Sequence, residues 1–543
     1  MEKDKTVCGG DMNVGCRTFA DMKGGNRAAK LLEDAFSIYG GREDDNTLSR
    51  LILTNAAGRK YFVNDNVWWK YTDVQCNFHA TYGWRPFFDA AYRKVDRNTW
   101  QELFKYQVTP QMQDVLKKSA GALKVPPTDF LPFNYDPLTD DLSIARFYSN
   151  VPMDEETGKL KSPEEAAGYS ENVDYPLMNC ISATDYLLWE RDVEMACLYL
   201  PKLDAFLDAV HKRFQDDSGL LWVGTEGSQI EYCHKGFRYP AHTHVYLLKV
   251  YRNMQEAARF AERIDLVDKY GQKASELEKK MALFIEDGKW FVGGLKDAAG
   301  QGRYGTGRLD DSASSYFDAW HNVNAVVLHI ANEDLSRSIA DKIASIPAMT
   351  ANHLTLVNYP ARPEEEIDFP NEGSIVPGQH MNAGWHWMLS AGALYTYTRT
   401  QQPDLLLQLE GLLSDHHNHY SIDYYNDYGA DKHKQWPEHG RDSYSVTCAG
   451  AFGMFFRALL GLEMTADGMR VSPRLPRECE SLTTIAPVYY AGKKVRFKAN
   501  NGTGSIRQVH LNGKPYSLHD DNAVTLPYVE LGLENMVEVE RKD

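Results

Sequence analysis

The sequence lacks the features that mark membrane proteins and nucleic-acid-binding proteins. No run of 18 or more apolar residues occurs among its 543 residues, so no segment is expected to span a bilayer as a helix. Dense runs of Lys and Arg are also missing, and 75 acidic residues outnumber 59 basic ones, which gives a formal net charge of −16. Because nucleic acids and anionic lipid surfaces attract basic proteins, we expect neither as a partner.

Cysteine pairs and a targeting segment are missing as well. The eight cysteines are scattered without a C-x-x-C pair, which predicts buried thiols instead of a zinc cluster. The first residues, Met1 to Lys5, are polar and have none of the apolar core of a signal peptide. This favours a cytoplasmic protein, with a secreted or periplasmic form whose signal peptide has been removed as the alternative.

Motifs of several common chemistries do not occur. There is no G-x-S-x-G elbow of a serine hydrolase, no G-x-x-x-x-G-K-S/T phosphate loop and no H-E-x-x-H zinc helix. The spelling G-x-G-x-x-G from Gly300 to Gly305 lies in a polar loop without a preceding strand, so it does not predict a dinucleotide site. The sequence therefore predicts neither a cofactor nor a bound metal.

Aromatic residues, by contrast, are plentiful. The chain contains 11 Trp, 31 Tyr and 22 Phe, which together make up 12% of its residues. Such side chains mostly fill cores and interfaces, but aromatic rings also stack on the C–H faces of sugars, so the composition permits carbohydrate binding. A length of 543 residues predicts three or four domains of ordinary size, or fewer if one of them is a large closed ring.

The spacing of apolar residues changes twice along the chain. Residues 1–150 are mixed, with short strands expected at 51–53 and 60–63 around a glycine turn. Residues 151–465 carry apolar residues at three- and four-residue spacing, which predicts helices. These helices are expected at about 176–188, 198–214, 242–264, 266–285, 316–330, 335–346, 381–398, 403–413 and 445–460. In residues 466–543, apolar and polar residues alternate within short stretches, and Gly and Asn turns separate these stretches. This pattern predicts a small antiparallel β-sandwich.

Long loops rich in Gly, Asp, Trp and Tyr separate the expected helices. They lie at 216–238, 300–315, 357–379 and 416–442. Loops of this length are uncommon in compact domains unless they serve a function. Helices joined alternately by short turns and long loops predict helical hairpins arranged in a ring, with the long loops gathered on one face.

Four local patterns follow one another in the helical region. They are Tyr175–Trp189 with the later Asp217-Ser-Gly-Leu-Leu-Trp222, the loop Gly224–Tyr232, Phe369–Pro377 leading to Gly384-Trp-His-Trp387, and Gln435-Trp-Pro-Glu-His-Gly440 ahead of 445–462. In this order, over residues 175–475, they resemble the (α/α)6-toroid glycosidases, which include glucoamylases, trehalases, processing α-glucosidases, α-L-rhamnosidases and the cellobiose- and maltose-type phosphorylases. The resemblance implies a mainly α fold, an (α/α)6 toroid with a mixed N-terminal lead-in and a small C-terminal antiparallel β-sandwich.

The resemblance also implies a glycoside hydrolase that inverts the anomeric centre with two carboxyl groups. One donates a proton to the glycosidic oxygen, and the other, about 6.5–9.5 Å away, activates water. By motif position, Glu438 is expected to be the general base, since it follows Pro437 ahead of the last long helix. Glu226 is favoured as the general acid because its turn of small residues lets a sugar approach closely. Glu231 is the alternative, since burial beside Tyr232 would raise its pKa.

Other acidic residues are alternatives for the general acid, and the motifs do not determine which sugar is bound. Asp310 and Asp311 are further candidates. Glu372 stands where relatives often have Gly, so it is either a third acidic residue of the sugar subsite or the acid itself. Val376-Pro377 replaces the second Trp of the relatives' pattern, and the Arg-Asp signature of many α-glucosidases is missing. The expected substrate is an α-glucoside or a rhamnoside-like sugar.

The substrate-binding residues are predicted from the same patterns. Tryptophan rings are expected to line the sugar subsites, with packing in the core as the alternative for each, and polar side chains to bond the hydroxyls. The set comprises Trp68, Trp69, Trp222, Trp320, Trp385, Trp387, Trp436, Asp310, Asp311, Asn371, Glu372 and His380. A carbohydrate substrate is thus the expected partner.

Three other functions are known on the same kind of toroid. A phosphorylase would use phosphate in place of the base, although a carboxylate at Glu438 would repel it. A polysaccharide lyase would use Tyr and His beside a uronate, and its acidic substrate would favour a basic cleft, which a net charge of −16 argues against. A catalytically inactive relative would bind sugar without turnover.

Overall fold

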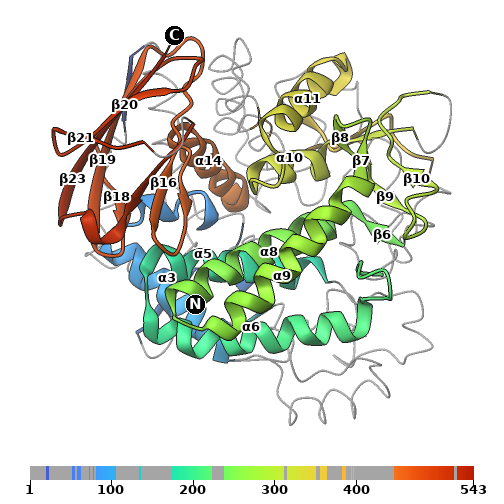
Figure 1. Ribbon diagram of the computed structural model, residues 1–543, viewed down its shortest axis with the longest axis horizontal. Coiled ribbons are helices and arrows are strands. Elements are labelled where there is room, and N and C mark those ends of the chain that lie inside the picture. Colours follow the sequence, from blue (N-terminus) through green and yellow to red (C-terminus); the bar gives the residue numbers. More distant parts are fainter. Residues whose placement is uncertain are drawn as a thin grey trace, which may run out of the picture.

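Three successive helical hairpins form the body of the protein in its computed structural model (Figure 1). The structure describes residues 20–23, 52–54, 58–62, 72–73, 78, 81–105, 134–135, 173–222, 238–310, 315–349, 355–363, 382–386, 393, 396, 445–518 and 522–542. The hairpins are α5 (Asp174–Glu190) with α6 (Val193–Phe214), α8 (Ala241–Phe260) with α9 (Ile264–Met281), and α10 (Ala319–Val327) with α11 (Glu333–Ala344). These six helices confirm the ones predicted between residues 176 and 346, with ends that differ by a few residues.

The hairpins form an inner and an outer layer of helices. All nine residues of α10 are buried, and α5 and α8 are buried along nearly their whole length. By contrast, α9 and α11 each bury one apolar stripe at three- and four-residue spacing, as a helix with one face in solvent does. In α9 this stripe comprises Leu266, Tyr270, Ala274, Leu277 and Met281. Because α5 and α10 both pack against α8, the first helix of each hairpin lies in the inner layer.

Three helices, α5, α8 and α14 (Ser445–Leu460), end close to one another. Arg191, just beyond α5, donates a hydrogen bond to the Ala466 carbonyl at 2.7 Å. Arg259, at the end of α8, forms an ion pair with the neighbouring Asp467 at 3.0 Å. The last residue of α14 precedes these two residues by only a few positions. Since α5 and α8 also pack side by side, both begin on the opposite side of the molecule.

The N-terminal 3-10 helix η2 (Arg85–Phe87) packs against α14, so distant parts of the sequence meet there. The helix α3 (Ala90–Lys105) follows it and packs against α5 and α6, with the Trp100 ring 6.4 Å from Tyr186 and the Phe104 ring 3.8 Å from Tyr199. A Cβ atom on Gly83 would lie 2.2 Å from the Met454 nitrogen, and one on Gly453 would lie 2.6 Å from the Trp84 ring. Only glycine at both positions allows the two segments to come this close.

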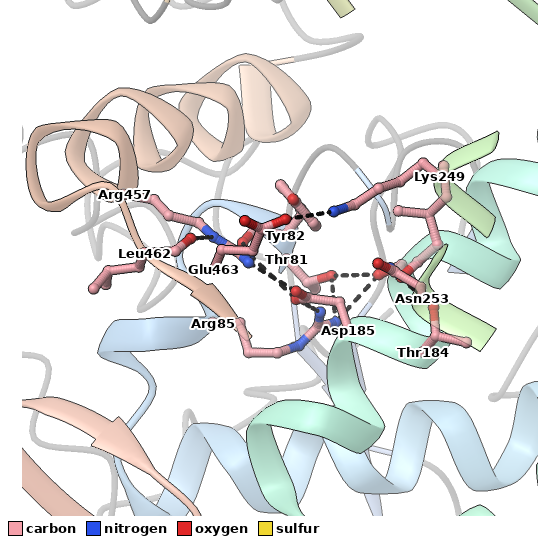
Figure 2. A network of polar contacts seen from close by, with 12 residues as sticks. Thr81, Tyr82, Arg85, Thr184, Asp185, Lys249, Asn253, Arg457, Leu462 and Glu463 are labelled. Atoms are coloured by element: carbon pink, nitrogen blue, oxygen red, sulfur yellow. Dashed lines mark hydrogen bonds and ion pairs between the residues drawn. The ribbon is translucent and has the colours of Figure 1, made fainter. Parts of the chain in front are cut away.

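A buried network of charges joins this contact to α5 and α8 (Figure 2). The Asp185 carboxylate on α5 accepts hydrogen bonds from Arg85 at 2.6 Å and from Arg457 on α14 at 2.8 Å. These three side chains are at most 6% exposed. Nearby, the Glu463 carboxylate accepts a hydrogen bond from Lys249 on α8 at 3.3 Å. The first and last described helices of the helical region are therefore linked by paired charges held out of water.

Two sheets make up the C-terminal region. The larger has the order β1-β17-β19-β23-β20-β21 with β18 also paired to β19, and the smaller has the order β15-β16-β22. Their bounds are β1 Ala20–Lys23, β15 Glu463–Met464, β16 Gly468–Val471, β17 Ser481–Thr484, β18 Val488–Tyr490, β19 Lys493–Asn500, β20 Ile506–Leu511, β21 Lys514–Tyr516, β22 Val524–Pro527 and β23 Glu534–Arg541, with η8 at Tyr528–Glu530. β19 and β23 are parallel, so the antiparallel expectation is wrong for this pair. Alternation of apolar residues predicts a strand but not the direction of its partner.

One strand of the larger sheet comes from the other end of the sequence. β1 lies antiparallel to β17, with Ala20 opposite Thr484 and Lys23 opposite Ser481. The buried and exposed residues of β1 alternate, as expected for a strand with one face toward the core. Residues 20–23 therefore belong structurally to the C-terminal sheet.

Short paired strands surround the starts of α8 and α10. β6 leads directly into α8 and pairs with β9, and β11 leads into α10 and pairs with β13. The bounds of the short elements are β4 Thr72–Asp73, β5 Asn134–Tyr135, β6 Tyr239–Pro240, β7 Ile285–Glu286, β8 Trp290–Phe291, β9 Gly294–Leu295, β10 Arg303–Tyr304, β11 Phe317–Asp318, β12 Thr355–Leu356, β13 Asn358–Tyr359 and β14 Trp385–His386, with η5 at Ala282–Phe284 and η6 at Pro347–Met349. The pairs β6–β9 and β11–β13 fix the direction from which the chain enters α8 and α10.

The remaining sequence predictions have mixed outcomes. The early hairpin is confirmed as β2 (Ile52–Thr54) and β3 (Lys60–Phe62). The helix predicted from residue 381 does not include Trp385 and His386, because these two residues pair with β12 as strand β14. The helix predicted at 403–413 lies outside the described residues, as does the stretch 397–444 that a closed ring requires. None of the described helices combines the length and apolar character needed to cross a membrane.

Candidate functional site

The N-terminal ends of α5, α8 and α10 meet in a buried polar cluster. Asp174, the first residue of α5, faces two side chains from the first turn of α8. The His242 Nε2 lies 2.7 Å from one carboxylate oxygen of Asp174, and the Thr243 hydroxyl donates to the other oxygen at 2.6 Å. We call Asp174, His242, Thr243, Asp318 and His321 the inner-end cluster.

Helix α10 contributes Asp318 and His321 to the inner-end cluster. The ring centres of His321 and His242 lie 4.7 Å apart, and the His321 Nδ1 is 3.4 Å from Asp318 Oδ1. The same Asp318 oxygen caps α10 by accepting the His321 amide at 3.2 Å. The other oxygen, Oδ2, has no hydrogen-bond partner among the described residues. All five residues of the cluster are 0% exposed.

Burial shifts the pKa values of Asp318 and His321 in the directions that favour their uncharged forms. Removal from water raises the pKa of Asp318 to about 7, although the His321 amide and the nearby His242 ring lower it in part. The same removal from water, with His242 close by, holds the pKa of His321 well below its ordinary value. The cluster thus contains a carboxyl group that exchanges its proton close to neutral pH, next to an uncharged imidazole.

Replacing Asp318 with Asn is expected to stabilise the protein at alkaline pH. Asn caps a helix about as well as Asp but does not ionise. Because the pKa of Asp318 is raised from 3.8 to about 7, its contribution to stability is present below pH 3.8 and is lost as the pH rises through 7. The stability of Asp318→Asn relative to wild type should therefore grow by roughly 2–3 kcal/mol between pH 5 and pH 9, as measured by urea unfolding at each pH.

The matched control for this prediction is Asp334→Asn. Asp334 lies in the first turn of α11, and its side chain is 95% exposed, so no charge is buried there. The difference between Asp334→Asn and wild type should be nearly the same at pH 5 and pH 9. A difference that is equally constant for Asp318→Asn would show that Asp318 does not titrate as a buried carboxyl group.

Both flanks of the segment 223–237 are held at the start of α8. The His244 Nε2 accepts the Leu221 amide at 3.0 Å, and the His244 Nδ1 lies 2.7 Å from the Pro240 carbonyl oxygen. Removal from water lowers the pKa of His244 to about 4, so the ring is uncharged at neutral pH. Leu221 and Pro240, on either side of the segment that carries the two acid candidates, are therefore held by the same side chain.

Two further contacts join the same flanks. The Tyr239 hydroxyl donates to the Asp216 carboxylate, which also accepts the Ser218 amide at 2.9 Å. The Arg238 guanidinium lies 5.7 Å from the centre of the Trp222 ring, within the range of a cation–π contact. Trp222 is 48% exposed, so this predicted substrate-binding ring is accessible to a ligand.

Three other predicted substrate-binding residues lie within the described chain. Trp320 is 2% exposed, and its indole nitrogen donates to the Tyr246 hydroxyl at 3.2 Å. Asp310 is exposed ahead of β11, and its carbonyl oxygen accepts a hydrogen bond from the Ser315 hydroxyl. Trp385 lies in β14. As contacts of a sugar, these residues stay predictions.

The other predicted site residues lie outside the described residues. They are Glu226, Glu231 and Glu438, with Trp68, Trp69, Asp311, Asn371, Glu372, His380, Trp387 and Trp436. Three of the segments that contain them, 223–237, 311–314 and 397–444, precede α8, α10 and α14 either directly or with one short strand between. Their roles stay predictions.

The inner-end cluster was not predicted from the sequence. Its signal was present, because Asp174, Asp318 and the two histidines His242 and His321 are polar residues at the starts of helices that are otherwise mainly apolar. A polar side chain buried with such a helix needs a partner, which makes neighbouring helix starts the places to look.

Two further observations on the described residues concern a metal site and a pocket. Among these residues, no group of three or more His, Cys, Asp or Glu side chains is arranged to hold a metal ion. A pocket of about 290 Å³ lies between α8, α9 and the turn after α6, lined in part by Asp216, Tyr251, Lys273 and Lys280. None of the four described residues predicted for the sugar site lines this pocket.

Comparison with known proteins finds similar chains among the solved structures. No family model and no curated protein matches the chain. A GH78 family rhamnosidase of Bacillus sp. GL1 aligns at 14% identity and a TM-score of 0.38, over 61% of this chain and 32% of the rhamnosidase. The GH63 mannosylglycerate hydrolase from Thermus thermophilus, in complex with glucose, aligns at 12% identity and a TM-score of 0.45, over 78% of this chain and 99% of the hydrolase.

A sialidase is also similar to this chain. It aligns at 12% identity and a TM-score of 0.46, over 66% of this chain. The chain spans 32% of the length of the sialidase, the same share as of the rhamnosidase. The rhamnosidase and the mannosylglycerate hydrolase have six-hairpin glycosidase folds, the group that the sequence resembles.

Proposed function

We propose that the protein is a glycoside hydrolase that works by inversion, with Glu226 as general acid and Glu438 as general base. Glu226 donates its proton to the glycosidic oxygen as the bond from that oxygen to the anomeric carbon breaks. Glu438 accepts a proton from the water molecule that attacks the anomeric carbon from the opposite face. Both groups return to their starting protonation states by exchange with solvent. Glu231 is the alternative acid.

The observation that carries this proposal is the common side on which the inner helices begin. The helices α5, α8 and α14 all end near Ala466, and the inner-end cluster joins the starts of α5, α8 and α10. The segments with Glu226 and Glu438 lead into α8 and α14, and we take α14 to begin on the same side as α8 because the two helices end together. Seven positions separate Glu438 from Ser445, and seven extended residues span at most about 25 Å. These short connections support the proposal that the carboxyl groups of Glu226 and Glu438 both lie on the side where the inner helices begin.

The proposed substrate is a glycoside, with an α-glucoside or a rhamnoside-like sugar as the first choices. The exposed ring of Trp222 lies next to the segment that carries Glu226 and offers an apolar face to a sugar ring. Polar contacts in this proposal come from Asn371, Glu372 and His380. The excess of acidic residues agrees better with a neutral sugar than with a uronate.

Hydrolysis of a panel of aryl glycosides, followed by proton NMR, tests the proposal. We expect turnover of at least one glycoside without added phosphate, with the inverted anomer appearing first. First release of the retained anomer would contradict inversion. Turnover that requires phosphate would identify a phosphorylase instead, and sugar binding without turnover would identify a non-catalytic relative.

A further inference from the structure

One histidine forms hydrogen bonds to both flanks of the segment that carries the acid candidates Glu226 and Glu231. Its Nε2 lies 3.0 Å from the Leu221 amide, before the segment, and its Nδ1 lies 2.7 Å from the Pro240 carbonyl oxygen, after it. A backbone amide only donates and a carbonyl oxygen only accepts. The two partners therefore fix His244 as the uncharged tautomer with its proton on Nδ1.

The surroundings of His244 hold the ring in this position. His244 and Leu221 are 0% exposed, Pro240 is buried, and the Phe284 ring packs on the imidazole with its centre 4.8 Å away. A buried amide or carbonyl that loses its partner costs about 1–3 kcal/mol, which disfavours any rotation of the ring. The two hydrogen bonds are therefore constant features of the start of α8.

A second link crosses the same segment independently. The hydrogen bond from Tyr239 to Asp216 joins the two flanks without touching the histidine ring itself. This bond ties the segment to the turn after α6, whereas His244 ties it to the inner helix α8. Of these two links, the histidine is the one that joins the flanks of the segment directly to an inner helix.

We propose that His244 is a positioning residue, which sets the place of the general acid by fixing both ends of the segment 223–237 to the first turn of α8. This inference rests on the proposed function, because it takes the acid to be Glu226 or Glu231. His244 acts through the Leu221 amide and the Pro240 carbonyl and contacts neither the sugar nor the reacting atoms.

Misplacing a general acid has an effect that depends on the leaving group. The alkoxide that leaves a methyl glycoside needs a proton as the bond breaks, whereas 2,4-dinitrophenolate is stable enough to leave without one. Destabilising the whole protein would instead reduce the active fraction and lower both rates by the same factor. The ratio of the two rates therefore separates a positioning role from a purely structural one.

The test compares wild type with His244→Phe on the methyl and 2,4-dinitrophenyl glycosides of the sugar that the panel identifies. Phe keeps a ring of similar size and loses both hydrogen bonds. We expect kcat/KM to fall about 100-fold for the methyl glycoside, since a shift of about 1 Å has effects of this size. For the dinitrophenyl glycoside, kcat/KM should stay within about threefold of wild type. His244→Gln, whose amide both donates and accepts, should recover part of the loss.

A matched control changes another histidine that lies outside this contact. His211 on α6 is partly buried and hydrogen-bonded to the Tyr251 hydroxyl, and this bond does not involve the flanks of the segment. His211→Gln should leave the ratio of the two rates unchanged. If His244→Phe does not fold, His244→Asn takes its place, because its shorter amide does not reach the Leu221 amide.

Amide hydrogen exchange at Leu221 gives a readout that does not depend on activity. Exchange should be faster in His244→Phe than in wild type and unchanged in His211→Gln. Equal losses on both glycosides, or unchanged exchange at Leu221 in His244→Phe, would overturn the role of His244. If wild type hydrolyses no glycoside, the proposed function fails, whereas the exchange result still decides whether His244 holds the segment.

Discussion

Glu438→Gln is expected to lower kcat for glycoside hydrolysis by about 10³-fold or more. Gln has the size of Glu but does not take a proton from the attacking water, and the loss of a general base has effects of this order. Thermal unfolding should be unchanged within error, since the substitution preserves the shape of the side chain. Steady-state kinetics on the best glycoside of the panel, together with a melting curve, measure both quantities.

Two further variants and a control complete this experiment. Glu226→Gln and Glu231→Gln distinguish the two acid candidates, because only loss of the true acid should slow the methyl glycoside while sparing the dinitrophenyl glycoside. Glu478→Gln is the matched control, since Glu478 is exposed in the C-terminal region, and its kinetics should equal those of wild type. Turnover by Glu438→Gln at the wild-type rate would remove the assignment of the base.

Asp185→Ala is expected to destabilise the protein by about 3–5 kcal/mol. The substitution removes the carboxylate between Arg85 and Arg457, and leaves two guanidinium groups buried without their shared partner. Because the network joins α5 to α14 and to the segment before α3, the loss should appear as a lower midpoint of thermal and urea unfolding. Glu534→Ala is the matched control. Glu534 pairs with Lys494 on the surface, and its removal should cost less than about 1 kcal/mol.

The destabilisation of Asp185→Ala should also depend on pH. Burial alone would raise the pKa of Asp185, but Arg457 and Arg85 outweigh it and hold this pKa below its ordinary value of 3.8. A lowered pKa means that the carboxylate stabilises the folded state above pH 3.8 and loses this effect as the pH falls. The difference between wild type and variant should therefore shrink below about pH 4. A difference that is constant from pH 7 to pH 3 would contradict the role of Asp185 as an ion-pair partner.

The helices were predictable from the sequence because their signal is local. In α9 the apolar residues recur every three or four positions, and the neighbouring residues are polar, so the pattern predicts both the helix and its buried face. The strands of the C-terminal region were predictable for the same reason. The parallel pairing of β19 with β23 was not, because it depends on which strands meet after folding.

The polar contacts between helices were harder to predict. Asp185 reads as one polar residue within an apolar helix, and its partners Arg85 and Arg457 lie 100 and 272 positions away in the sequence. The inner-end cluster is similar, since Asp174 and His242 are 68 positions apart. Such contacts exist only once the hairpins pack side by side. The acid and base candidates came from motif resemblance, which predicts roles without giving distances.

The pairing of β1 with β17 delays part of the fold during synthesis of the chain. Residues 20–23 leave the ribosome about 460 positions before their partners at 481–484. At roughly 5–20 residues per second, β1 waits about 20–90 seconds for its neighbour. An unpaired strand can join a wrong partner, but β1 has only four residues, and every second one is exposed in the folded sheet, which keeps its attraction for other strands small. The larger sheet is therefore completed long after β1 itself has been made.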